Sequence, residues 1–236
     1  QMIEDGTITA ENAKIGYVGA FPFAEVISGF TSFFLGARSQ CPSVTMEVRY
    51  TNSWGDMALE KETAEALIAD GCVLISQHAD TTGAPSACEA AGVPCVGYNI
   101  SMLPVAPNTA LTSAAGDWGA YVTYAVKCLI DGEEIARDWC KGYAEGAVYT
   151  TELNDSIVAP GTAEKVAELE EAFKAGTVKV FDTSTFTVNG ETLTSYTTAY
   201  GLEGIEMVSD GEFHESSVRS APYFDILIDG ITAVVE

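Results

Sequence analysis

The chain has 236 residues, of which 47% are hydrophobic, and this is enough to bury the core of one large domain or two lobes. A formal net charge of -23, from 34 acidic and 11 basic residues, argues against nucleic acid and anionic membranes as partners, because both require positive charge. No apolar run is long enough to span a bilayer, and the first residues have no signal-peptide pattern.

Residues 1–12 contain the segment MIEDGTI, which is typical of the end of a helix. We therefore expect the chain to begin inside a longer protein. Any signal or lipid anchor would then lie outside this sequence.

Strands and helices alternate from residue 14 to residue 99. Apolar, β-rich runs predict strands over 14–21, 43–51, 72–77 and 93–99. Helical spacing predicts helices over 24–40, 56–71 and 83–92, with Gly71 and Gly92 suited to helix ends. Because the strands are almost continuously apolar, the sheet should be parallel and covered on both faces. Right-handed crossovers then make this part a doubly wound α/β lobe.

The second half has a different pattern. Residues 110–134 predict a short strand and a helix with one apolar face, formed by Tyr121, Val122, Ala125 and Leu129. Residues 161–178 predict an amphipathic helix that ends at Gly176, with an inward face formed by Val166, Leu169 and Phe173. Asn189-Gly190 predicts a hairpin near residues 181–196, and the last 17 residues predict one or two further strands.

This order predicts four parts. Residues 1–12 would be the end of a helix from an N-terminal lobe, and residues 13–110 would form the ligand-binding lobe. Residues 111–141 would cross toward the other lobe, and residues 142–236 would complete the lobes. No long linker or low-complexity segment separates these parts.

The cysteines and histidines do not form a metal-binding pattern. Six cysteines have no paired CxxC spacing, and only two histidines are available as further ligands. Most of the cysteines are typical of small buried residues, and Cys88 with Cys95 is the best candidate for a local bridge. Phosphate-binding glycine motifs are also missing, so we expect neither a metal nor a cofactor.

Polar and aromatic residues follow each predicted strand. Because ligands bind outside the carboxyl ends of parallel strands, these residues should share one edge of the sheet. They are Phe21, Phe23, Asn52, Trp54, His78, Asp80, Tyr98, Asn99, Asp117 and Trp118. Rings that stack on a ligand, together with amide and carboxylate groups that bind its edge, favour a flat, hydrogen-bonding ligand.

Two alternatives compete with this interpretation. Phe21, Phe23 and Trp118 could belong to the core, and Asp80 could cap the helix that follows it. His78 and Asp80 could instead be a catalytic base and its orienting partner, as in a hydrolase. No nucleophile motif such as GxSxG accompanies them, so binding is favoured over catalysis.

The motifs FPFAEV, NSWGD, QHAD and GYN occur in this order, and together they resemble the basic membrane protein family of ABC-transporter substrate-binding lipoproteins. Within that family the chain looks most like the purine-binding branch, adenine binders in particular. The resemblance implies a type I periplasmic-binding-protein-like fold of two α/β lobes, with the N-terminal lobe incomplete or absent here. It also implies a monomeric, membrane-anchored protein outside the cytoplasm that is not an enzyme and delivers its ligand to permease subunits.

The resemblance also implies roles for single residues. Phe21 or Phe23 would stack on the ligand, Trp54 would line the cleft, and Asp80 with Asn99 would face the ligand edge. Nucleoside-binding members carry an aspartate at the position of Asn99 and a lysine near Gly116. Because both of those groups would bind a ribose, their absence favours a free base or another flat heterocycle over a nucleoside. A ligand-sensing domain of a receptor or regulator is the alternative that shares this fold.

Overall fold

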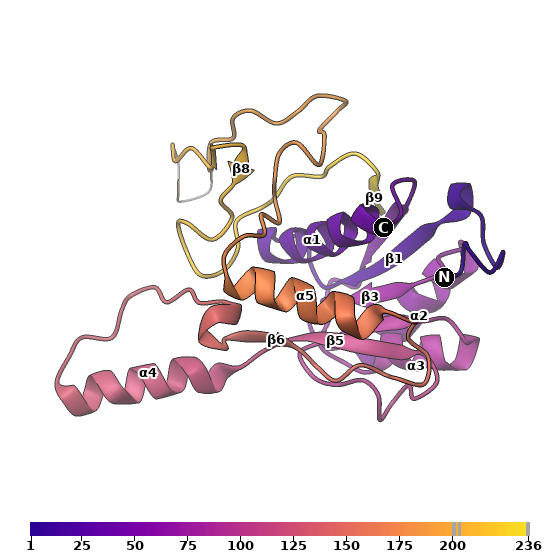
Figure 1. Cartoon of the computed structure of the whole chain (residues 1–236), viewed down its shortest axis with the longest axis horizontal. Coiled ribbons are helices and arrows are strands. Elements are labelled where there is room, and N and C mark those ends of the chain that lie inside the picture. The colour runs from indigo at the N-terminus through magenta and orange to yellow at the C-terminus, as the bar shows by residue number, and fades with distance from the viewer. Residues whose placement is uncertain (200–201, 203, 235–236) are drawn as a thin grey trace.

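A seven-stranded sheet forms the centre of the computed structural model, which describes residues 1–199, 202 and 204–234 (Figure 1). Its strand order is β6-β5-β4-β3-β1-β2-β9. The strands are β1 (Lys14–Gly19), β2 (Thr45–Tyr50), β3 (Ile75–Gln77), β4 (Cys95–Tyr98), β5 (Ala110–Gly116), β6 (Val148–Thr150) and β9 (Ile231–Val234). All neighbouring strands pair in parallel except β5 and β6, which are antiparallel.

Helices cover both faces of this sheet. Helix α1 (Ala24–Gln40) lies on one face, and helices α2 (Met57–Ala69) and α3 (Gly83–Ala91) lie on the other (Figure 1). Tyr17 of β1 belongs to the α1 core and the next residue, Val18, belongs to the α2–α3 core, as the alternation of side chains along a strand requires. The predicted doubly wound α/β lobe is thus confirmed.

Helices α2 and α3 approach each other at a glycine. A Cβ atom at Gly83 would lie 2.4 Å from the backbone oxygen of Met57, so only glycine allows this contact. The Asp56 side chain begins α2 by accepting hydrogen bonds from the backbone of Ala58 and Leu59. The contact holds the start of α3, and with it the loop after β3, against α2.

The first residues form a single turn rather than a regular helix. Thr7 N–H donates to the Met2 carbonyl and Gly6 N–H donates to the Ile3 carbonyl, while Gly6 has a φ of 71°. This pair of hydrogen bonds is the pattern of a helix C-terminus with glycine just beyond it. A short 3-10 helix, η1 (Ala10–Asn12), then leads into β1.

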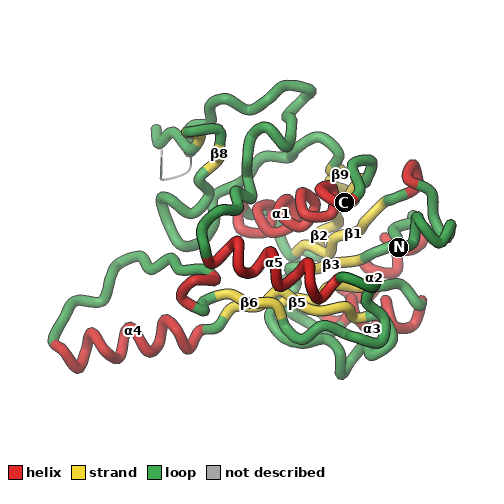
Figure 2. The backbone as a smooth tube through the Cα atoms, viewed as in Figure 1, coloured by secondary structure: helices red, strands yellow, loops and turns green. Residues whose placement is uncertain are grey.

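The described residues of the segment between 178 and 230 have little regular structure and pack over α1 (Figure 2). A two-stranded ribbon, β7 (Val208–Ser209) with β8 (Glu212–Phe213), is the regular strand pairing that its described residues form. Aromatic side chains fix the segment, since they share a core cluster with Phe30 and Phe34 of α1: Phe181, Phe186, Phe213 and Phe224.

The hairpin predicted near residues 181–196 is reduced to its turn. Asn189 and Gly190 both have positive φ, and Val188 and Glu191 exchange two backbone hydrogen bonds. Among the described residues no longer ladder continues from this bridge. The Asp229 carboxylate instead binds the turn by accepting from the backbone N–H groups of residues 189 and 190. Of the strands predicted in the last 17 residues, β9 is the one described, and it pairs with β2.

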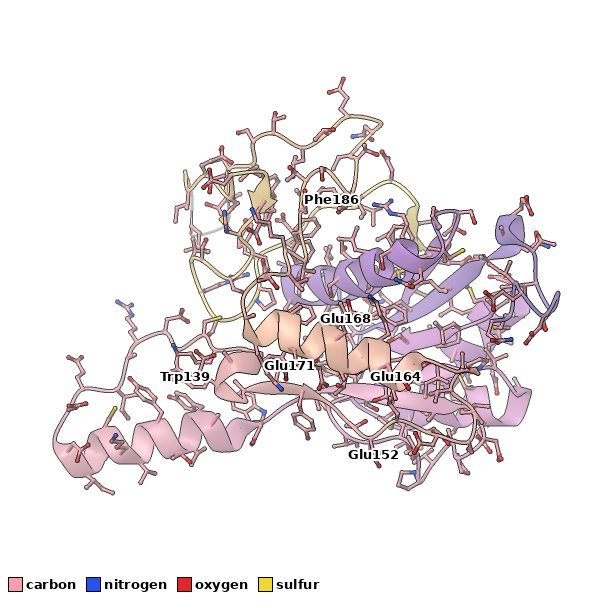
Figure 3. The ribbon with its side chains drawn as sticks, viewed as in Figure 1. Trp139, Glu152, Glu164, Glu168, Glu171 and Phe186 are labelled. Carbon is pink, nitrogen blue, oxygen red and sulfur yellow. The ribbon has the colours of Figure 1, made fainter. Side chains whose placement is uncertain are left out.

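Helix α4 (Trp118–Asp131) projects away from the sheet (Figure 1). The apolar face predicted for it is not buried as a unit, because Val122 is 54% exposed and Leu129 is 70% exposed. The other side of the helix, which carries Tyr121 of the predicted face, is covered by the chain that follows, where Trp139 packs on Tyr121 and Tyr124 (Figure 3). Helix α4 therefore has one covered and one open apolar side.

Helix α5 (Thr162–Lys174) also differs from its prediction. Its apolar side chains Val166, Leu169 and Phe173 do face the protein, but they line a cavity of about 880 Å³ between α5 and α1 and are not buried. Phe173 stacks on Tyr143 of the short 3-10 helix η2 (Tyr143–Glu145). Three of the four acidic residues of the helix are exposed: Glu164, Glu168 and Glu171 (Figure 3).

Candidate ligand-binding site

A pocket of about 410 Å³ opens at the carboxyl ends of the central strands. The loops after β2, β3, β4 and β5 form its walls, together with the first turn of α1. The lining residues are Glu25, Trp54, His78, Asp80, Tyr98, Asn99, Ile100, Gly116 and Trp118. Strand-end residues therefore meet at one edge of the parallel sheet, where ligands of such sheets bind.

Aromatic rings form a continuous row along this edge. Phe21 and Phe23 stack with ring centroids 5.1 Å apart, and Trp54 lies 5.5 Å from Phe21. The row continues from Trp54 to His78 at 6.4 Å and from His78 to Tyr98 at 4.4 Å. Phe23 and Trp54 are 51% and 37% exposed, so the row presents apolar surface to the pocket side. Such a surface suits a flat ligand, which can stack on it.

His78 is held between two elements of the lobe. Its Nδ1 atom lies 3.4 Å from the hydroxyl of Tyr17 in β1, and a Cβ atom at Gly29 of α1 would lie 2.6 Å from the same nitrogen. Burial lowers the pKa of His78 to about 4. The ring is therefore neutral near pH 7 and serves as an uncharged aromatic side chain with hydrogen-bonding nitrogens.

Asp80 and Asn99 form a polar pair at the rim. The Asn99 side-chain amide donates to Asp80 Oδ1 over 2.9 Å. Asn99 has a φ of 64°, a left-handed conformation that asparagine tolerates better than most residues. The amide orients the carboxylate and leaves its second oxygen without a partner among the described side chains, so the oxygen can accept from a ligand.

Buried groups fix the loop that carries Asp80. Glu60 of α2 is fully buried, and its carboxylate accepts from Thr81 N–H at 3.1 Å and from the Thr81 hydroxyl at 2.7 Å. Burial raises the pKa of Glu60, while the bonds from Thr81 oppose that rise. The Gln77 side chain donates to the carbonyls of Ala79 and Thr81. The loop is thus built into its conformation before any ligand arrives.

Six of the ten residues predicted for the site line the pocket: Trp54, His78, Asp80, Tyr98, Asn99 and Trp118. Phe21 and Phe23 extend the row of rings beside it. Asp117 does not line the pocket; its Oδ1 accepts a hydrogen bond from Gly119 N–H and caps the N-terminus of α4. Asn52 has a φ of 53° in the turn after β2 and does not line the pocket.

Glu25, Ile100 and Gly116 line the pocket without having been proposed as ligand contacts. Glu25 lies in the first turn of α1, beyond the loop that follows β1. An acidic residue in a first helical turn is also commonly explained by the helix dipole, which hides a second role.

The cysteines take no part in this site. All six are free thiols, including Cys88 of α3 and Cys95 of β4, which both lie in the α2–α3 core. In the described part of the chain, no group of three or more acidic, histidine or cysteine side chains could hold a metal ion.

A doubly wound lobe with an aromatic and polar pocket at the carboxyl edge of its sheet is suited to binding a small molecule. The family model for ABC transporter substrate-binding proteins of the PnrA-like type, Bmp, matches residues 6–181, and the chain belongs to this family. It is a family of extracytoplasmic binding proteins and not of enzymes, so the hydrolase hypothesis for His78 and Asp80 is set aside. None of the described helices has the length and apolar character needed to cross a membrane.

Two curated relatives support the assignment. A purine-binding protein of Brucella abortus is 34% identical over 180 residues, which cover 75% of this chain and 51% of that protein. A Haloferax volcanii protein named as an ABC transporter glucose-binding protein is 32% identical over 201 residues, which cover 85% and 51%. The chain thus spans about half the length of these relatives.

A solved structure agrees on the fold. An ABC transporter solute-binding protein from Conexibacter woesei superposes with a TM-score of 0.56 at 20% identity. The match covers 75% of this chain and 60% of that one.

Proposed function

We propose that the chain is the ligand-binding lobe of an extracytoplasmic solute-binding protein that captures a purine-like ligand and delivers it to the permease of an ABC importer. The row of rings that includes Trp54, His78 and Tyr98 carries this proposal, because it offers stacking surface beside the polar pair Asp80 and Asn99. The relative named as purine-binding supports the same ligand class.

A free base fits this wall better than a nucleoside. The Asn99 amide is already engaged by Asp80, and Gly116 contributes no side chain to the pocket. Neither residue supplies the carboxylate or ammonium that the nucleoside-binding members use. The sugar hydroxyls of a nucleoside would therefore find fewer partners here than the edge of a base.

Residues 111–141 support the proposal that a second lobe forms the other wall of the ligand-binding cleft. The open side of α4 is a stripe at helical spacing, in which Trp118 is 77% exposed and Ile130 is 78% exposed. Its remaining members are Val122, Val126 and Leu129. A contiguous apolar stripe on a projecting helix is typical of a surface that another domain covers. We propose that α4 packs in the other lobe and that the two lobes close over the ligand by hinge motion.

A thermal-shift screen tests the ligand class. Adenine, guanine, adenosine, riboflavin and glucose are added in excess, and the purine bases should raise the Tm most, because they bind only the folded state. Replacement of Trp54 by alanine should weaken base binding by about tenfold, since base–aromatic stacking is worth about 1–3 kcal/mol. Trp139→Ala is the matched control, because Trp139 packs on α4 outside the pocket. A shift with glucose and none with any base would contradict the proposal.

A further inference from the structure

Two carboxylates face the pocket from different elements. Glu25 comes from the first turn of α1 and Asp80 from the loop after β3. Burial raises the pKa of Tyr98, and the nearby charges of Asp80 and Glu25 raise it further, so both carboxylates approach this ring. Among the described residues that line the pocket, none is lysine or arginine.

Both carboxylates keep capacity to accept hydrogen bonds. Asp80 makes one bond, from Asn99, and forms no ion pair within the described part of the chain. Glu25 is half-buried and has no hydrogen-bond or ion-pair partner among the described residues. Acceptors that face a pocket without a cationic partner favour a ligand that brings N–H donors or positive charge.

The aromatic residues that line the pocket also favour ligands with positive charge. The faces of Trp54, Tyr98 and Trp118 carry negative electrostatic potential and attract cations. An anionic ligand would meet like charge with no compensating group on this wall. The net charge of -23 opposes its approach as well.

We propose that Glu25 and Asp80 make the pocket selective for uncharged or cationic ligands that present N–H donors to both carboxylates, and that anions are rejected. Glu25 is thereby a specificity-determining residue. The inference rests on the proposed function, because it concerns the same pocket, but charge selectivity can be measured for any ligand that binds there.

Isothermal titration of the full chain with adenine and with urate, which is an anion at neutral pH, tests the selectivity. Adenine should bind at least about tenfold more tightly than urate, the effect of one unfavourable charge contact. Glu25→Gln should lower the affinity for adenine by about tenfold, because a charge-assisted acceptor is lost. It should also reduce the ratio between the affinities for adenine and urate. Glu62→Gln on the exposed face of α2 makes the same change of net charge and should alter neither affinity.

The outcomes separate this inference from the proposed function. Equal binding of adenine and urate, or unchanged discrimination in Glu25→Gln, would overturn the charge selectivity. If no purine binds, glucosamine and glucuronate replace the two probes. Binding of glucosamine with rejection of glucuronate would then overturn the purine proposal alone, and failure of all four probes would overturn both.

Discussion

The buried ring of His78 should make the folded protein sensitive to acid. Burial lowers its pKa from 6.5 to about 4, and each pKa unit corresponds to about 1.4 kcal/mol, so the full effect is about 3 kcal/mol. The unfolded chain takes up a proton as the pH falls through 6.5, whereas the folded chain does so only near pH 4. The stability due to neutral His78 is therefore complete above pH 6.5 and is lost as the pH falls to about 4.

Urea denaturation of the wild type and of His78→Gln measures this effect. Glutamine is uncharged at every pH, so the variant keeps a polar group beside Tyr17 without the titration. Its packing cost is the same at each pH and cancels when the change in unfolding free energy between about pH 7.5 and about pH 5 is compared. Over that interval the wild type should lose about 2 kcal/mol more than the variant, according to the linkage relation.

His214→Gln is the matched control for this comparison. It removes the other histidine of the chain, which lies beside Ser209 and outside the pocket, and leaves His78 in place. The acid-dependent loss should persist in this variant. Equal losses in the wild type and His78→Gln would refute the reasoning, because they would mean that the buried ring is protonated as readily as a free one.

Three further substitutions test the loops around the pocket. Glu60→Ala should lower the free energy of unfolding by about 3 kcal/mol, since it leaves the buried donors of Thr81 unpaired, and urea denaturation measures the loss. Asn99→Asp should lower the Tm near neutral pH, because it places a second carboxylate against Asp80 and removes the amide that donates to it, and a thermal melt measures the loss. Gly83→Ala should separate α2 from α3 and destabilise the fold by about 2 kcal/mol, because its Cβ atom meets backbone that cannot yield; an unchanged Tm would contradict this.

The order of strands and helices up to residue 99 could be predicted because local patterns determine it. Each strand is an apolar run, each helix has helical spacing, and a glycine with positive φ follows α3 at Gly92. The C-terminal segment could not be predicted in the same way. Its fold depends on contacts distant in sequence, such as Phe224 stacking on Phe181 and the Asp229 carboxylate binding the turn at Asn189.

Helix α4 shows a second limit of sequence patterns. Its apolar residues predict burial, yet Leu129 and Ile130 are among the more exposed hydrophobic side chains of the described residues. A periodic pattern tells which side of a helix avoids water, but not which part of the protein covers it. The sequence thus identified an apolar surface on α4 but could not tell what covers it.

The sequence and the structure lead to different interpretations of His78 and Asp80. Two residues apart, they could have been a base and its orienting carboxylate. In the structure Asp80 binds Asn99, whereas His78 Nδ1 faces Tyr17 inside the sheet, so each has a different partner. Spacing along a chain does not determine where the side chains of a loop point. Here the packing of Gly29 against the His78 ring and the hydrogen bond from Asn99 to Asp80 decide it. The two groups therefore do not form a base with its orienting carboxylate, and under the proposed function one is a ring that can stack on a ligand and the other is a hydrogen-bond acceptor.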